Sequence, residues 1–184
     1  MAALVSVNVA EPGREVVIGK RRVATGIFKR PVEGPVAVER LGLAGDFQAD
    51  PRVHGGPDKA VYLYPREHYA FWRDAHGLAA APWGFFGENL TIEGLLEDEV
   101  GPGDRLRAGT VTLEVTTPRG PCAKLGGRVG DPGFVKTFLE ACRPGFYARV
   151  VEQGVVRAGD ALERLSGPPV RVSISELARR KAGR

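Results

Sequence analysis

Short runs of alternating apolar and polar residues recur along this chain, and segments rich in glycine and proline separate them. The clearest run covers residues 111–117, where Val111, Leu113 and Val115 alternate with polar residues. An alternation with period two is typical of a β-strand with one buried face. With 25 glycines and 14 prolines in 184 residues, the chain has enough turns to join many such strands. The pattern predicts a mostly β fold, α+β overall, built on a closed or half-open β-barrel with a few peripheral helices.

Similar runs predict the positions of the other strands, and apolar residues at helical spacing predict a few helices. Strands are expected near residues 4–9, 16–18, 23–27, 36–43, 59–64, 85–92, 104–106, 110–117, 146–153, 155–156 and 170–174. The segments 16–27, 104–117 and 146–156 each indicate a hairpin. Helices are expected at residues 65–77, at 132–142, and from Ser175, which would be an N-cap. The pattern V-x-x-G-D-x-L at residues 100–106 and 156–162 indicates either partial internal symmetry or two uses of one turn.

No linker divides the chain. The sequence predicts a single domain, residues 1–184, with a core barrel at about 4–165 and a C-terminal strand and helix tail at 166–184. Its apolar runs are all shorter than the roughly 20 residues that a membrane-spanning helix needs. Its first residues lack the cationic head of a signal peptide. We therefore expect a cytoplasmic protein with no membrane partner.

The net charge of +4 comes from the end of the chain. Arg179, Arg180, Lys181 and Arg184 lie in the last six residues, and without them 22 cations balance 22 anions. A neutral body argues against nucleic-acid partners, because tracking phosphates needs many cations on one face. The basic tail is expected to be a solvated helix end, with a nucleic-acid or membrane anchor as the alternative.

Cys122 is the first candidate for chemistry, because it directly follows the clearest strand. Prolines and a glycine constrain the backbone around it, and Arg119 and Lys124 place a cation on each side. Nearby cations stabilise a thiolate, the form that attacks or binds a metal. The alternative is a buried, inert cysteine. Cys142 ends a predicted helix and is expected to have a core role, and a disulfide between the two is not expected in a reducing compartment.

Two loops are further candidates. In segment 53–59, Gly55 and Gly56 would let the backbone approach a ligand closely, and His54 and Lys59 add donors. Loop amides in succession can cradle a phosphate, and an ordinary turn is the alternative. In segment 86–90, Asn89 offers both a donor and an acceptor, which can read the edge of a heterocycle. Its alternative is a turn cap.

Other kinds of site find little support. There are three histidines and no C-x-x-C or H-E-x-x-H motif, so a zinc site is not favoured. Neither phosphate-binding motif, G-x-x-x-x-G-K-[ST] or G-x-G-x-x-G, occurs. G-x-S-x-G is absent and the chain has four serines, which disfavours a serine nucleophile.

Eight stretches, taken together and in order, resemble the MOSC domain, the domain at the C-terminus of molybdenum-cofactor sulfurases. They are residues 25–29, 42–46, 48–50, 54–62, 64–69, 86–90, 118–125 and 145–149. Within that family the chain is most similar to the free-standing bacterial YiiM type, over roughly residues 4–165. The resemblance implies a β-barrel-rich fold that holds molybdenum cofactor and reduces N-hydroxylated compounds, such as amidoximes and hydroxylaminopurine. The sulfurase's own pyridoxal-phosphate domain is absent, so no bound pyridoxal phosphate is expected.

The resemblance also implies roles for individual positions. Cys122 is expected to be the catalytic residue and the molybdenum ligand, since a soft thiolate suits a metal that a dithiolene already holds. The cofactor-binding candidates are His54, Gly55, Gly56 and Lys59 around the cofactor or its phosphate, Asn89 at the pterin, and Arg119, Lys124, Thr25 and Lys29. Electrons would come from a separate flavin or iron–sulfur protein, because two cysteines are too few for a cluster. The alternatives are a cofactor or sulfur carrier without turnover, and a cofactor-free binding module.

Overall fold

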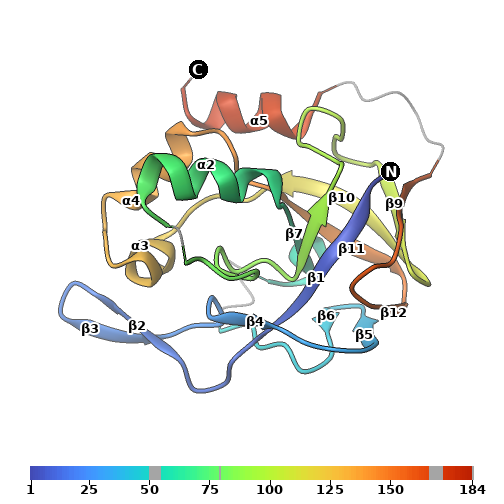
Figure 1. Ribbon diagram of the computed structural model, residues 1–184, viewed down its shortest axis with the longest axis horizontal. Helices are drawn as coiled ribbons and strands as arrows, with labels where there is room; N and C mark the ends of the chain where they lie inside the picture. The colour runs from blue at the N-terminus through green and yellow to red at the C-terminus, as the bar shows by residue number, and fades with distance from the viewer. Residues whose placement is uncertain (50–54, 79, 166–171, 184) are drawn as a thin grey trace.

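The computed structural model describes residues 1–49, 55–78, 80–165 and 172–183 (Figure 1). Within these residues the chain forms strands, one short 3₁₀ helix and α-helices. The strands are β1 (Ala3–Ala10), β2 (Glu15–Ile18), β3 (Arg21–Ala24), β4 (Lys29–Pro31), β5 (Val36–Glu39), β6 (Gly42–Leu43), β7 (Val61–Pro65), β8 (Leu90–Glu93), β9 (Arg105–Ala108), β10 (Val111–Pro118), β11 (Phe146–Glu152), β12 (Gly154–Val156) and β13 (Leu162–Arg164). The helices are η1 (Pro57–Lys59), α2 (Glu67–His76), α3 (Ala123–Val129), α4 (Phe134–Glu140) and α5 (Ile174–Lys181).

The main sheet has eight strands in the order β13-β9-β10-β11-β7-β8-β1-β4. All neighbouring strands are antiparallel except β7 and β8, which are parallel. Two small sheets, β12-β5-β6 and β2-β3, complete the strand pairing. The fold is therefore α+β and mostly sheet, as the alternating sequence runs predict.

Of the two expected forms, a closed or a half-open barrel, the closed one is wrong, because the strand order of the main sheet is open. Among the described residues, β1 approaches the β13 end of the sheet through an isolated bridge between Ala3 and Ala161 and a few backbone hydrogen bonds, such as Leu4 N to Asp160 O at 2.9 Å. The physical reason is length: β13 has three residues and cannot form a full ladder with the eight-residue β1. Alternation in the sequence predicts strands but not whether a sheet closes.

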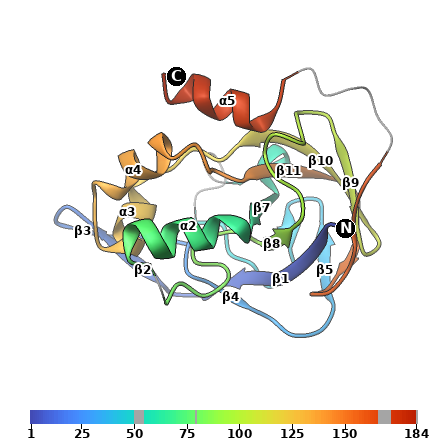
Figure 2. The same ribbon diagram turned by 45° about the horizontal axis from the view of Figure 1, so that its top comes forward.

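Two apolar cores fill the molecule. One lies within the main sheet and includes Leu63, Leu106 and Leu113. The other is aromatic and is built around Trp72 and Phe138, whose rings stack 5.3 Å apart. Helices α2, α3 and α4 gather at the end of the molecule that holds this aromatic core (Figures 1 and 2).

The helices agree in part with the sequence predictions. Helix α2 ends where Gly77 adopts a left-handed conformation, φ 67°, which glycine tolerates, and α4 lies within the predicted 132–142 segment. Helix α5 is capped by Ser173, whose side chain accepts a hydrogen bond from the Glu176 amide, and not by Ser175. The strand predicted near 170–174 falls partly on residues outside those described, and Ile174 belongs to α5.

Two details of strand pairing differ from expectation or extend it. The predicted hairpin at 146–156 is wrong, because β12 pairs with β5 and not with β11. The two V-x-x-G-D-x-L segments form the same turn: Asp104 accepts from the Gly101 amide and Asp160 from the Arg157 amide, both at 2.9 Å. They lead into β9 and β13, which pair with each other.

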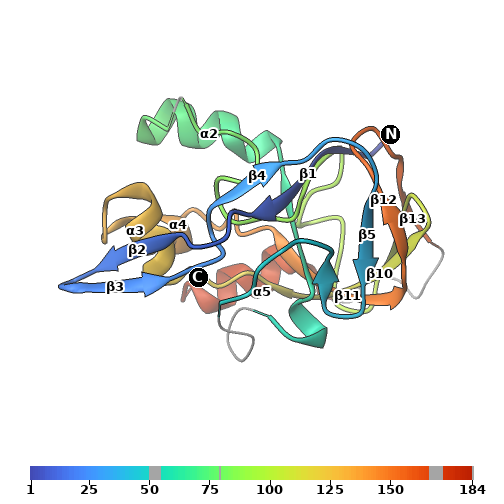
Figure 3. The same ribbon diagram turned by 90° about the horizontal axis from the view of Figure 1, so that it is seen from below.

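The β2–β3 hairpin extends from the body of the protein beside α3 (Figure 3). A Cβ atom on Gly127 of α3 would lie 2.9 Å from Val16 Cβ, so the helix and the hairpin touch closely. Arg128 of α3 lies 4.3 Å from the ring centre of Phe28, which follows the hairpin. None of the described helices is long and apolar enough to cross a membrane.

Candidate functional site

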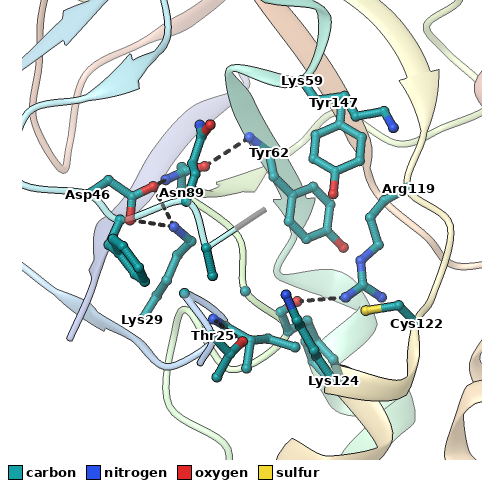
Figure 4. A pocket seen from close by; sticks show the side chains of 17 residues that line it. Thr25, Lys29, Asp46, Lys59, Tyr62, Asn89, Arg119, Cys122, Lys124 and Tyr147 are labelled. Atoms are coloured by element: carbon teal, nitrogen blue, oxygen red, sulfur yellow. Dashed lines mark hydrogen bonds and ion pairs between the residues drawn. The ribbon is translucent and has the colours of Figure 1, made fainter. Parts of the chain in front are cut away.

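A pocket opens where the segment after β3, the loop at 46–49, the start of β7, the turn at 86–89 and the end of β10 meet. The empty space in it is about 590 Å³, which includes space open to solvent. Figure 4 shows its wall. The lining residues are Thr25, Gly26, Ile27, Lys29, Asp46, Phe47, Gln48, Ala49, Lys59, Tyr62, Phe86, Gly87, Asn89, Arg119, Cys122, Lys124 and Tyr147.

Cys122 lies at the N-cap of α3 with an extended backbone, φ −141° and ψ 168°. Its sulfur points toward the Arg119 guanidinium, and the two groups interact electrostatically (Figure 4). The side chain is half-buried at the pocket wall, and no disulfide joins it to Cys142. The thiol is therefore placed beside a cation and within reach of a ligand in the pocket.

Arg119 is 5% exposed, yet no carboxylate forms an ion pair with it among the described residues. Its Nη2 donates a long hydrogen bond, 3.5 Å, to the Phe86 carbonyl, and its Nη1 is buried with no hydrogen-bond partner. Burial raises the pKa of both Tyr62 and Tyr147, so these neighbouring phenols stay neutral. A buried cation with an unused donor favours an anionic ligand at this place.

On the opposite wall, Lys29, Asp46 and Asn89 form a buried network (Figure 4). Asp46 accepts hydrogen bonds from Lys29 Nζ, from Asn89 Nδ2 at 2.8 Å, and from the Ala10 amide at 2.8 Å. Burial lowers the pKa of Lys29, against the opposing effect of the Asp46 charge. Asn89 Oδ1 accepts from the Tyr62 amide at 3.1 Å. The amide of Asn89 is thus bonded within the protein and holds Asp46 and β7 in place.

The remaining cations lie around the pocket. Lys59 is the last residue of η1, and its Nζ is 6.0 Å from the ring centre of Tyr147. Lys124 projects from the first turn of α3. Thr25 is buried, and its hydroxyl accepts from the Ile27 amide at 3.1 Å, which shapes the segment that leads to Lys29. Asp46 is the acidic side chain that lines this pocket among the described residues, and it is paired with Lys29.

The structure brings seven of the ten proposed site residues to one pocket: Thr25, Lys29, Lys59, Asn89, Arg119, Cys122 and Lys124. His54 lies outside the described residues. Gly55 and Gly56 precede η1 but do not line the pocket, and the Gly56 amide donates to Gln48 Oε1 at 3.4 Å. The sequence reasoning missed Asp46, Phe47, Tyr62 and Tyr147. Asp46 stands in the stretch 42–46, which was a signal of family resemblance without an assigned role.

Comparison with known proteins places this chain in a family. A family model for the MOSC domain matches residues 50–163. The chain belongs to the MOSC domain family. It is 42% identical over 166 residues to the uncharacterized protein YflK of Bacillus subtilis, covering 89% of this chain and 73% of YflK.

Two further relatives extend the comparison of this MOSC protein. The crystal structure of YiiM from Geobacillus stearothermophilus superposes with a TM-score of 0.78 at 34% identity, covering 99% of this chain and 84% of YiiM. A protein named reductase from Gibberella moniliformis is 32% identical over 160 residues, covering 85% of this chain but 28% of that protein. The MOSC chain therefore has a YiiM-like fold and a distant relative with a reductase name.

Proposed function

We propose that this MOSC protein binds molybdenum cofactor through Cys122 and reduces N-hydroxylated compounds. One observation carries the proposal: a reachable thiol and a buried arginine with an unused donor face the same pocket. The reductase name of a distant MOSC relative supports the reaction class. Amidoximes and N-hydroxylated purine bases are the substrates that the family resemblance favours.

The residues present fit the cofactor. No group of three or more His, Cys, Asp or Glu side chains among the described residues could hold a metal by itself. A metal at Cys122 would therefore need other ligands from outside the protein, and the dithiolene of the pterin is such a source. The cofactor carries a phosphate, and Lys59, Arg119 and Lys124 offer donors of the required charge.

The chain's own residues would hold and orient the cofactor. Cys122 would ligate the metal, Arg119 and Lys124 would bind the anionic cofactor, and Lys59 would contact its phosphate. The geometry favours a positioning role for Asn89, through Asp46 and β7, over direct contact with the pterin. Lys29 and Thr25 would shape the same wall.

The reaction needs electrons and protons from outside the substrate. Reduction of an N-hydroxy group, R–NH–OH + 2 e⁻ + 2 H⁺ → R–NH₂ + H₂O, breaks the N–O bond and releases the oxygen as water. The bound cofactor supplies the two-electron chemistry, and a separate flavin or iron–sulfur protein supplies the electrons. We place the reaction in the cytoplasm, where a reducing environment keeps the Cys122 thiol available.

The test is molybdenum content and turnover of protein from a host that makes the cofactor. We expect near-stoichiometric metal in the wild type and in Cys142→Ser, and little in Cys122→Ser. With reduced viologen as electron source, the metal-containing proteins should convert 6-N-hydroxylaminopurine to adenine. Metal without turnover would favour the carrier alternative and overturn the enzyme proposal. Absence of metal from the wild type would overturn both.

A further inference from the structure

Phe47 is an exposed aromatic ring at the pocket. Its side chain is 43% exposed and belongs to the residues that line the pocket. Among the described residues, the other large exposed hydrophobic side chains do not line it; they are Met1, Val17, Leu41, Val151 and Val155. The other aromatic side chains that line the pocket, Tyr62, Phe86 and Tyr147, are buried, so Phe47 offers the exposed aromatic surface among the described lining residues.

The chain on both sides of Phe47 is fixed. Asp46 is held by the Ala10 amide, Lys29 and Asn89. Gln48 donates to the Leu41 carbonyl at 2.9 Å, and its side-chain oxygen accepts from the Gly56 amide. The ring is thus exposed on an anchored backbone, and little conformational freedom is lost when a ligand packs against it.

Gly26 fixes the same backbone from the other side. A Cβ atom at Gly26 would collide with the Phe47 carbonyl oxygen, so glycine at this position lets the segment after β3 lie directly against residue 47. This close backbone contact adds a third anchor for residue 47, beside those of Asp46 and Gln48.

We propose that Phe47 is a specificity-determining residue whose ring stacks against flat, conjugated substrates. It would select N-hydroxylated heteroaromatic bases over small aliphatic amidoximes. Any flat base can stack on an aromatic side chain, because every base has a π-face, and this stacking is lost when the ring is removed. This inference rests on the proposed function, because it assigns the substrate side of the same pocket.

The test compares two substrates on four variants of the molybdenum-loaded protein. The substrates are 6-N-hydroxylaminopurine, which is flat and conjugated, and acetamidoxime, which is small. Phe47→Ala should raise KM for the purine about tenfold with kcat nearly unchanged, and leave KM for acetamidoxime within about twofold. Phe47→Leu, which keeps apolar area but loses the ring, should behave like Phe47→Ala, and Phe47→Trp should retain the low KM. Leu41→Ala, which removes another exposed apolar side chain, is the matched control and should change neither substrate.

A binding measurement gives a readout without turnover. Calorimetry should show adenine, the flat product, binding the wild-type holoprotein about tenfold more tightly than Phe47→Ala. Equal effects on both substrates, or an adenine affinity that Phe47→Ala leaves unchanged, would overturn the inference while the reductase activity stands. Failure of the wild type to reduce either substrate would instead count against the proposed function.

Discussion

The ammonium nitrogen of Lys29 lies 2.6 and 2.5 Å from the two carboxylate oxygens of Asp46, and the two side chains are only 7% and 4% exposed. Burial removes water from both charges, so each depends on the other for compensation. Asn89 and the Ala10 amide complete the hydrogen bonds of the carboxylate. This ion pair therefore connects β4 to the loop that carries Phe47.

Replacing Asp46 by alanine should destabilise the protein strongly. The change leaves a buried ammonium without its partner, which costs about 3–5 kcal/mol of unfolding free energy. Urea unfolding of Asp46→Ala against the wild type measures this loss. Asp74→Ala is the control, since Asp74 forms an exposed pair with Arg73 and its loss should change stability little. A similar small loss for both variants would contradict the assigned importance of the buried pair.

Arg119→Met should separate cofactor binding from stability. Methionine fills similar space against Tyr62 and Phe138 but removes the unused buried donor. Loss of charge-assisted bonds to an anion, about 1.5–3 kcal/mol, predicts cofactor retention about 10- to 100-fold weaker. Molybdenum content after dialysis measures retention, and the thermal midpoint of the cofactor-free protein should not fall. Arg30→Met, at an exposed position, is the control. Equal molybdenum retention in Arg119→Met and Arg30→Met would contradict a cofactor-binding role for Arg119.

Gly127→Ala should weaken the contact between α3 and the β2–β3 hairpin. Alanine favours helix by about 1 kcal/mol, but its Cβ would lie 2.9 Å from Val16 Cβ, and overpacking costs about 1–3 kcal/mol. A net loss of about 1 kcal/mol is expected, with faster hydrogen exchange in the hairpin. Gly120→Ala meets no atom within 4 Å and should change little. Stabilisation by Gly127→Ala would show that the helix can move away from Val16 without cost.

Glu88 predicts a pH dependence of stability. This buried carboxyl accepts hydrogen bonds from the Tyr69 hydroxyl and the Gly84 amide, but burial raises its pKa above the ordinary value of 4.5. Between 4.5 and the raised pKa, the folded protein holds a proton that the unfolded chain releases, so this group's contribution to stability falls as pH rises. Glu88→Gln lacks that titration. The unfolding free energy of Glu88→Gln minus that of the wild type should therefore increase from pH 4.5 to pH 8. A difference that does not change with pH would refute the raised pKa.

The sequence predicts strong local signals and misses elements that depend on distant contacts. Helix α2 was predictable from its spacing of aromatic residues and from Gly77, although Pro65, expected as its first residue, ends β7 and the helix begins at Glu67. Helix α3 was not, because Gly126 and Gly127 are poor helix formers, at roughly 1 kcal/mol each relative to alanine. Packing against Val16, more than a hundred residues earlier in the chain, compensates for that propensity.

The same distinction applies to the site. Arg119, Cys122 and Lys124 are close in sequence, so a pattern around one strand end was enough to group them. Phe47 and Tyr147 join the pocket only through strand pairing and loop packing, which no local pattern reveals. The role of Asn89 likewise depends on Asp46, whose position needs the whole fold.

Strand β1 precedes all of its partners in the chain, and most of them come much later. Only its last three residues pair early, with β4, whereas Val7 pairs with Leu90 and Ala3 bridges to Ala161. Until those residues leave the ribosome, Leu4 and Val7, which are buried in the folded protein, have no core to enter. Nascent chains of this protein should therefore expose the apolar side chains of β1 until these later partners have been synthesised, and depend on chaperones or rapid completion to avoid aggregation.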